Sequence, residues 1–104
     1  MVPTVTSDTT SILSARDEIV AACERHGCGH VRVFGSVARG EAGPDSDLDL
    51  LVDIVGDTPQ WFPGGLIAEL EQLLGRRVDI STPEGLNPWL KEAVLQEAVS
   101  LLKE

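Results

Sequence analysis

The chain has 104 residues, enough for one compact core and too few for two independently stable domains, so we expect a single domain. Its composition is 42% hydrophobic and 24% charged and contains no apolar run of roughly 18 residues, so no membrane-spanning segment is expected. The net charge of −9 argues against a protein that holds long stretches of DNA or RNA, because Lys and Arg contacts to phosphate supply most non-specific affinity.

The first residues do not have the pattern of a secretory signal. Residues 1–11 carry no positive charge ahead of their first apolar residues and contain no apolar core of the kind that signals need. A cytoplasmic protein is therefore expected. Residues 1–9 are expected to form a flexible N-terminus, because helical spacing begins only near Thr10, and residues 10–104 to form the single domain.

Helical spacing of apolar residues predicts a first helix over residues 10–26. Gly27 follows at the position where a left-handed C-terminal cap is expected. Ser14 and Asp17 match a capping box, so the regular helix is expected to begin near Ala15. The apolar stripe of this helix consists of Ile12, Ala15, Ile19, Ala22 and Cys23.

Two cysteines and two histidines lie close together at the end of this helix and just after it. They are Cys23, His26, Cys28 and His30. Residues of these types bind zinc in many proteins. Burial in the core is the better supported alternative, since Cys23 falls on the apolar stripe and small thiols are ordinary core residues.

Two strands are expected in the middle of the chain. Residues 30–34 carry alternating apolar side chains and run directly into Gly35. Residues 48–55 are nearly all apolar except for Asp49 and Asp53, which is typical of a strand buried on both faces. The second strand should therefore be central in its sheet.

The second half of the chain predicts two further helices and a strand. Helical spacing resumes over residues 66–74 and stops at Gly75, and residues 77–81 form a short strand. Asn87-Pro88 combines an N-cap with a first-turn proline. The final helix would carry Leu90, Val94, Ala98 and Leu101. The order helix, strand, strand, helix, strand, helix predicts an α+β fold, an α/β sandwich with helices packed on a small mixed sheet.

A strand that ends in Gly-Ser and turns into a short helix is suited to binding phosphate. Such a turn presents backbone N–H groups and a hydroxyl, and the absent Cβ of Gly35 lets phosphate oxygens come close. Ser36 would then donate a hydrogen bond to a phosphate. Taken alone, the same pair is also typical of an ordinary turn.

Asp47 and Asp49 lie two positions apart at the start of the predicted strand 48–55, so their side chains leave the same face. Asp47 by itself is equally typical of a solvated turn. Asp49 lies among apolar residues, where an ionised carboxylate without a partner costs several kcal/mol. We therefore expect Asp49 to be paired, hydrogen-bonded or metal-bound.

Asp79 repeats this pattern on a later strand, between Val78 and Ile80, and a neighbouring strand would bring it near the first two carboxylates. A salt bridge to Arg76 or Arg77 is the alternative role. The sequence offers no Ser-His or Cys-His set as a candidate for nucleophilic catalysis. Three carboxylates with a phosphate-binding turn instead indicate phosphoryl chemistry assisted by two metal ions.

Gly35-Ser36, ten intervening residues and Asp47-Leu48-Asp49 together resemble the nucleotidyltransferase signature of the DNA polymerase β superfamily. The fuller run over residues 34–52 resembles the minimal, MNT-type nucleotidyltransferases, prokaryotic proteins of about this length. The segments 75–79 and 86–88 are also similar to this group. The resemblance covers roughly residues 15–98.

The resemblance implies the nucleotidyltransferase fold and a magnesium-dependent enzyme with ATP as substrate and two bound Mg²⁺ ions. Gly35 and Ser36 would bind the triphosphate, and Arg39 would either neutralise phosphate charge or lie on the surface. The implied metal ligands are Asp47, Asp49 and Asp79. Asp79 would act either as a ligand or as the base for the acceptor hydroxyl.

MNT-type proteins are often antitoxins paired with HEPN-domain ribonuclease toxins, and some transfer AMP from ATP to a tyrosine of the toxin. The resemblance therefore implies a protein adenylyltransferase that acts on a HEPN-type toxin. One alternative is an antitoxin that neutralises its partner by binding alone. Another is a transferase for a small molecule such as an antibiotic, for which so short a chain would have to dimerise or borrow a pocket from a partner.

Three aromatic residues have two interpretations. Trp61, Phe62 and Trp89 would form a docking surface for a partner, since aromatic side chains are enriched in interface hot spots, or would pack in the core.

Overall fold

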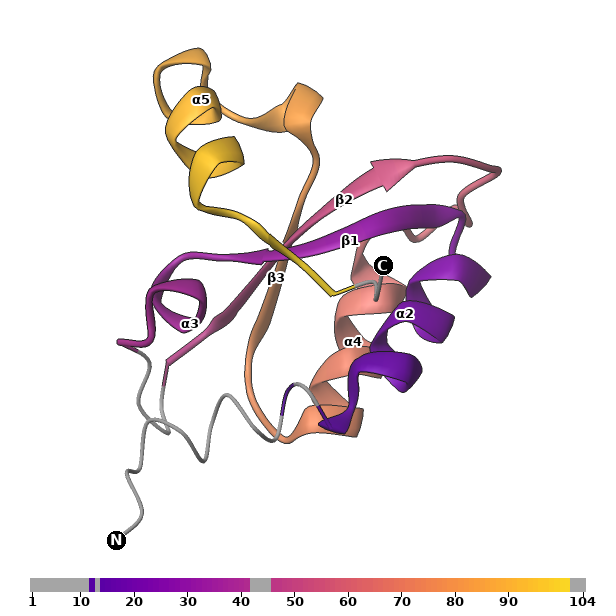
Figure 1. Cartoon of the computed structure of the whole chain (residues 1–104). Helices are drawn as coiled ribbons and strands as arrows, with labels where there is room; N and C mark the ends of the chain where they lie inside the picture. The colour runs from indigo at the N-terminus through magenta and orange to yellow at the C-terminus, as the bar shows by residue number, and fades with distance from the viewer. Residues whose placement is uncertain (1–11, 13, 42–45, 102–104) are drawn as a thin grey trace, which may run out of the picture.

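The computed structural model describes residues 12, 14–41 and 46–101 of the chain (Figure 1). Its helices and strands follow one another as α2 (Arg16–Arg25), β1 (Cys28–Phe34), α3 (Ser36–Arg39), β2 (Leu48–Ile54), α4 (Gly64–Leu74), β3 (Val78–Ser81), the 3₁₀ turn η1 (Pro83–Gly85), α5 (Pro88–Glu97) and β4 (Val99–Ser100). The α+β class is confirmed, and the predicted order holds with α3, η1 and β4 added.

The four strands form one mixed sheet in the order β3-β2-β1-β4. β1 is antiparallel to both β2 and β4, whereas β2 and β3 are parallel. β2 is therefore an inner strand, as its apolar run predicts. Its fully buried side chains are Leu48, Leu50, Leu51 and Val52.

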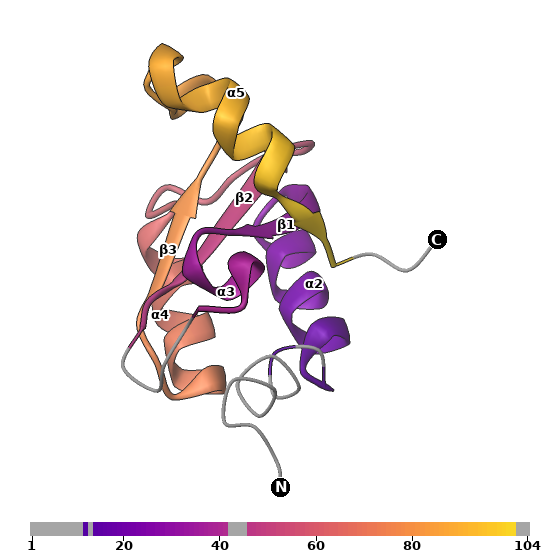
Figure 2. The ribbon, with the colours of Figure 1, turned by 60° about the vertical axis from the view of Figure 1, so that its left-hand side comes forward.

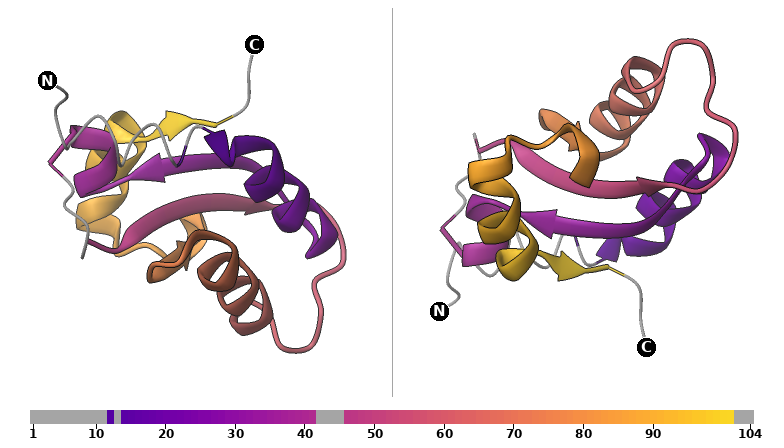
Figure 3. Two further views of the ribbon diagram at one scale, coloured as in Figure 1. Left: turned by 90° about the horizontal axis from the view of Figure 1, so that it is seen from below. Right: turned by 90° about the horizontal axis from the view of Figure 1, so that it is seen from above.

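α2 and α4 cover one face of this sheet. The core cluster on that face includes Ile19, Cys23, Leu48, Leu50, Val52, Leu66 and Leu70. Side chains alternate along a strand, so Asp49 and Asp53 leave β2 toward the opposite face. α5 lies away from α4, at the other end of the sheet, in all views (Figures 1, 2 and 3).

The first helix begins without the expected capping box. α2 starts at Arg16 with Ala15 as its N-cap and has no side-chain cap hydrogen bond, so the role predicted for Ser14 and Asp17 is wrong. The N–H of Ala15 instead donates to the carbonyl of Ile12 at 3.2 Å. Ser14 is itself helical, whereas an N-cap residue takes a non-helical conformation, so it cannot cap α2. The expected start of the regular helix near Ala15 is confirmed.

Three other helix ends, marked in the sequence by Gly27, Gly75 and Asn87, are confirmed. Gly27 follows α2 with φ of +83°, and Gly75 ends α4 with φ of +69°. At the start of α5 the side chain of Asn87 accepts a hydrogen bond from the N–H of Trp89 at 2.9 Å. These observed ends agree with the predicted ones because glycine and asparagine determine helix ends through local backbone geometry.

The final helix is shorter than its apolar spacing predicts. α5 ends at Glu97, and Ala98 leaves the helical conformation with ψ of 140°. The chain then forms β4 against β1, and the N–H of Leu101 donates to the carbonyl of Val31 at 2.9 Å. Leu101 is thus buried from the edge of the sheet, because β1 offers unpaired backbone groups there.

Residues 1–9, expected to be flexible, lie outside the described residues, so the domain boundary stays a prediction. Within residues 12, 14–41 and 46–101, no helix is both long and apolar enough to cross a membrane.

Candidate functional site

The candidate residues gather where β1 ends and where β2 and β3 begin. Gly35 follows the last residue of β1, and Ser36 begins α3 directly after it. Asp49, the second residue of β2, is paired with Phe34 on one side and with Asp79 of β3 on the other. Strand pairing therefore brings together three segments that lie far apart in the sequence.

Gly35 is required at the end of β1 for two physical reasons. Its φ of +78° lies in the region that side chains with a Cβ rarely adopt. A Cβ added there would also lie 2.3 Å from the Oδ2 atom of Asp49. The turn and the carboxylate are thus in close contact, and only glycine fits between them.

Asp49 interacts electrostatically with several of the other candidate residues. Burial raises its pKa, and the charges of Asp79 and Asp47 raise it further. The positive charge of Arg39 acts in the opposite direction. Asp49 therefore has carboxylates as its main charged neighbours, an arrangement typical of cation-binding and catalytic sites.

Asp47 lies just before β2 and is half-exposed. Its Oδ1 atom is 3.4 Å from Nε of Arg77. Arg77, which the sequence offered as a partner for Asp79, therefore pairs with Asp47. An exposed ion pair of this kind contributes little to stability, so Asp47 can exchange Arg77 for another cation at small cost.

The chemistry of this donor set suits a hard divalent cation. Mg²⁺ prefers carboxylate oxygens, and a cation offsets the mutual repulsion that raises the pKa of Asp49. Among the described residues, no three Asp, Glu, His or Cys side chains are already gathered as a metal cage. The carboxylates thus fit a cation, and the full expected ligand set stays a prediction.

Arg39 lies on α3 next to the turn and has two carboxylate partners. Its Nε atom donates to Glu41 at 2.9 Å and its Nη1 atom to Glu97 at 3.0 Å. Glu97, the last residue of α5, also accepts a hydrogen bond from the backbone N–H of Gly35 at 2.5 Å. No local sequence signal indicates Glu97, because its place at the turn depends on how α5 returns to the sheet.

Comparison with known proteins identifies the family. A model of the nucleotidyltransferase domain family matches residues 17–101, which include all six candidate residues. This chain belongs to the nucleotidyltransferase family. The expected family and enzyme class are therefore confirmed.

Curated relatives cover nearly the whole of this nucleotidyltransferase. It is 41% identical over 90 residues to the protein adenylyltransferase MntA of Thermococcus cleftensis, covering 86% of this chain and 88% of that one. It is 35% identical over 92 residues to a Methanocaldococcus jannaschii protein named "Putative protein adenylyltransferase MJ0435", covering 88% and 99%.

Solved structures agree with this fold. One, described as "Structure of putative minimal nucleotidyltransferase", has a TM-score of 0.78 and 48% identity and covers 88% of this chain and 93% of the other. A toxin-antitoxin crystal structure with AMP-PNP has a TM-score of 0.72 at 19% identity, covering 86% of this chain and 73% of the other. The second likeness supports the fold alone.

The cysteine–histidine cluster of this nucleotidyltransferase is structural. Cys23 and Cys28 are both fully buried free thiols. The Nε2 atom of His26 lies 3.0 Å from Oε1 of Glu69, and the Nδ1 atom of His30 lies 3.1 Å from Oδ2 of Asp53. The core interpretation is confirmed for both thiols, and the two imidazoles are hydrogen-bonded to different carboxylates.

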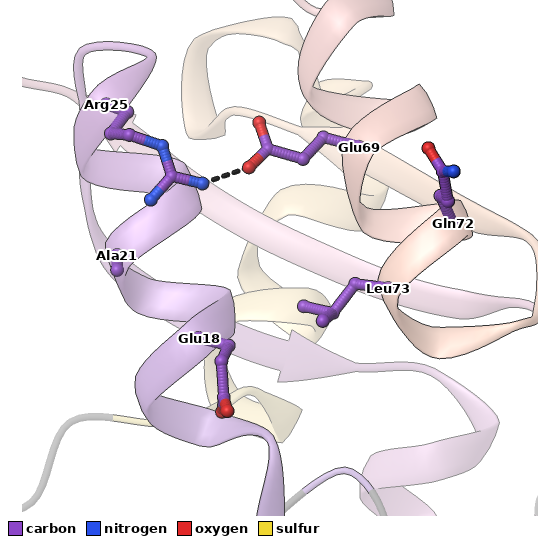
Figure 4. Close-up of a pocket in the computed structure, with 6 residues that line it drawn as sticks. All are labelled: Glu18, Ala21, Arg25, Glu69, Gln72 and Leu73. Atoms are coloured by element: carbon purple, nitrogen blue, oxygen red, sulfur yellow. Dashed lines mark hydrogen bonds and ion pairs between the residues drawn. The ribbon is translucent and has the colours of Figure 1, made fainter.

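Two cavities are lined by residues outside the candidate set. One of about 350 Å³ lies between α2 and α4 and is lined by Glu18, Ala21, Arg25, Glu69, Gln72 and Leu73 (Figure 4). Arg25 and Glu69 form an ion pair there. Another, of about 270 Å³, is lined by Phe62, Pro63, Ile80, Ser81, Thr82 and Gly85. None of the six candidate residues lines either of these two cavities.

The three aromatic residues divide between the two interpretations. Phe62 is partly buried against the core cluster. Trp61 is 77% exposed and Trp89 is 88% exposed. Of these three aromatic residues, the two tryptophans of this nucleotidyltransferase are therefore the ones exposed enough to contact a partner.

Proposed function

We propose that this nucleotidyltransferase transfers AMP from ATP to a hydroxyl group of a partner protein, a HEPN-type toxin that it thereby inactivates. The observation that supports this most is the position of Asp49, in contact range of the Gly35 turn and paired with Asp79. A phosphate-binding turn and a carboxylate pair are then adjacent. The names of the two curated relatives favour AMP transfer to protein.

Each candidate residue has a role in this proposal. The N–H of Gly35 and the hydroxyl of Ser36 hold the triphosphate, with Arg39 offsetting its charge. The proposed magnesium ligands are Asp47 and Asp49, and Asp79 is either a third ligand or the base for the acceptor hydroxyl. Bound Mg²⁺ would offset the charge of triphosphate and carboxylates and stabilise the charge that develops on the transferred phosphoryl group.

The transfer is a displacement at the α-phosphorus of ATP. The acceptor oxygen forms a bond to this phosphorus, the bond from the phosphorus to the oxygen that bridges to the β-phosphate breaks, and pyrophosphate leaves with the electron pair. A carboxylate takes the hydroxyl proton. Asp79 is our candidate for this base, because it lies on the edge strand β3 and its side chain is exposed to an incoming acceptor.

The position of Asp79 on an edge strand favours a protein acceptor over a small molecule. An antibiotic or sugar is typically held in an enclosed pocket. A loop of a folded protein can reach Asp79 on an exposed edge strand. The net charge of −9 disfavours a nucleic-acid acceptor.

Neutralisation by binding alone is the second candidate function. It is favoured by α5, on which Trp89 is 88% exposed and Leu90 is 57% exposed. Exposed apolar side chains of this kind suit a protein interface. In this alternative the carboxylates would be dispensable.

The test uses the purified protein, isotope-labelled ATP, MgCl₂ and the purified HEPN-type toxin encoded beside it. We expect the toxin to gain one or more AMP groups by mass spectrometry and to lose ribonuclease activity. Asp49→Asn should prevent both effects, whereas Asp57→Asn removes the same charge beyond the far end of β2 and should prevent neither. A toxin that is inactivated equally by Asp49→Asn without gaining AMP would establish the binding-only alternative.

We also propose that residues 10–104 form one folded domain and that the protein is cytoplasmic. Limited proteolysis is expected to trim the chain near residue 9 and to leave one stable fragment.

A further inference from the structure

The carboxylate of Glu97 is hydrogen-bonded to the Gly35 N–H and the Arg39 guanidinium, the groups that bind phosphate in the proposed function. Its Oε2 atom accepts a hydrogen bond from the N–H of Gly35 at 2.5 Å, and its Oε1 atom accepts one from Nη1 of Arg39 at 3.0 Å. The side chain is 27% exposed. One internal anion thus bridges the turn and the guanidinium.

A carboxylate and a phosphate group compete for such donors because both present anionic oxygens to N–H groups. Hydrogen bonds to an ionised acceptor are about twice as strong as neutral ones. The N–H of Gly35 lowers the pKa of Glu97, and Arg39 lowers it as well, although burial opposes them. Glu97 is therefore ionised at neutral pH and bound as an anion.

α5, which carries Glu97, is weakly attached to the rest of the domain. None of its residues is buried. Trp89, Leu90 and Leu95 are exposed along it. Rotation of the Glu97 side chain, or movement of the end of α5, would therefore break few apolar contacts.

We propose that Glu97 is an internal competitor of the triphosphate: its carboxylate occupies the Gly35 N–H and the Arg39 guanidinium and must leave them before ATP binds. This inference rests on the proposed function, because it takes the Gly35 turn as the phosphate site. It predicts a protein whose nucleotide affinity is held down by its own chain. Anything that draws the end of α5 away from the turn would raise that affinity.

The test compares the ATP affinity of Glu97→Gln with that of the unmodified protein, by isothermal titration with MgCl₂. We expect about tenfold tighter binding, because the variant replaces an ionised acceptor by a neutral one. Glu92→Gln is the matched control, since Glu92 is an exposed residue of the same helix. It makes the same change in net charge and should leave ATP affinity unchanged.

A second measurement follows the contact without nucleotide. The amide proton of Gly35 is expected to move upfield in the NMR spectrum of Glu97→Gln, as its hydrogen bond to a carboxylate is lost, and to stay in place in Glu92→Gln. Circular dichroism checks that both variants are folded. Glu97→Ala provides the same comparison should the glutamine side chain keep the contact.

The outcomes separate this inference from the proposed function. If the unmodified protein binds ATP and Glu97→Gln and Glu97→Ala bind it no more tightly, the competition is refuted and the proposed function stands. A Gly35 amide that does not respond to either Glu97 substitution also refutes it. If neither the unmodified protein nor any Glu97 variant binds ATP with magnesium, the proposed function fails and the competition fails with it.

Discussion

Asp49 on β2 and Asp79 on β3 lie directly opposite each other in the parallel pairing of these strands. Paired residues of neighbouring strands project from the same face of a sheet, so both carboxylates point away from the helices α2 and α4. Burial raises the pKa of Asp49, and the charge of Asp79 raises it further. The fold thus concentrates negative charge at a place where ionisation opposes folding, as is common at functional sites.

Replacing Asp49 by Asn is expected to raise the melting temperature at pH 7. Because the folded-state pKa of Asp49 is raised, protonated Asp49 contributes stability below the pKa of the unfolded chain, and this contribution is lost as the pH rises through the folded-state pKa. The advantage of Asp49→Asn should therefore shrink as the pH falls through the raised folded-state pKa and be lost below about 4, where Asp49 is protonated in both states. Melting temperatures measured from pH 7 down to about pH 4 test this expectation, with Asp57→Asn as the control. A lower melting temperature for Asp49→Asn at pH 7 would contradict the electrostatic account.

Gly35→Ala is expected to destabilise the fold by roughly 1–3 kcal/mol through backbone strain, and by more through the contact with Asp49. It should also abolish ATP binding, because the turn has to shift. Gly40→Ala is the matched control, since Gly40 has φ of +74° but an added Cβ there meets nothing within 4 Å. It should cost only about 1–2 kcal/mol and keep ATP binding. Equal loss of ATP binding in both variants would mean that strain alone is responsible.

Ser36→Ala is expected to weaken ATP binding by about 1–2 kcal/mol, the size of one hydrogen bond to a charged group. Isothermal titration measures this as a change of about 5–30-fold in Kd. Ser81→Ala, at the end of β3, should leave the affinity unchanged. Unchanged affinity in Ser36→Ala would assign Ser36 to the turn alone.

Asp79→Asn is expected to keep the fold and most of the ATP affinity while slowing AMP transfer by about 10²-fold or more, because a general base contributes to the chemical step. Titration with ATP and rates of labelled AMP transfer, measured on one preparation, separate the two effects. Turnover at the unmodified rate would leave Asp79 with a structural role only.

Both thiols are expected to react slowly with a disulfide reagent in the native protein. Burial, followed by the neighbouring Cys28, raises the pKa of Cys23 to about 12. Burial also raises the pKa of Cys28. The thiolate is the reactive form, so reaction at pH 8 should be slow until the chain unfolds. The rate at which a disulfide reagent releases its coloured product, with and without guanidinium chloride, tests this. Fast reaction of either thiol in the native protein would contradict its burial.

Short-range patterns were sufficient to predict most elements. The apolar run of β2 predicts an inner strand, and Gly75 and Asn87 act through their own backbone geometry, so each is readable in a few neighbouring residues. The same holds for Gly35, Ser36 and the pair Asp47 and Asp49, whose spacing carries the family resemblance. At the start of α2 the predicted capping box is wrong, because Ser14 is itself helical and Ala15 is the N-cap.

Only the tertiary structure decided which distant residues meet. The sequence by itself identified Asp79 as a carboxylate on a strand, but the parallel pairing of β2 and β3 places it beside Asp49. It did not indicate that Arg77 would contact Asp47, or that Glu97 would lie on the Gly35 turn. Strand order and the return of the chain through β4 depend on the joint burial of apolar side chains and the pairing of backbone groups across the whole domain. Such contacts leave no periodic signal in the segments that make them.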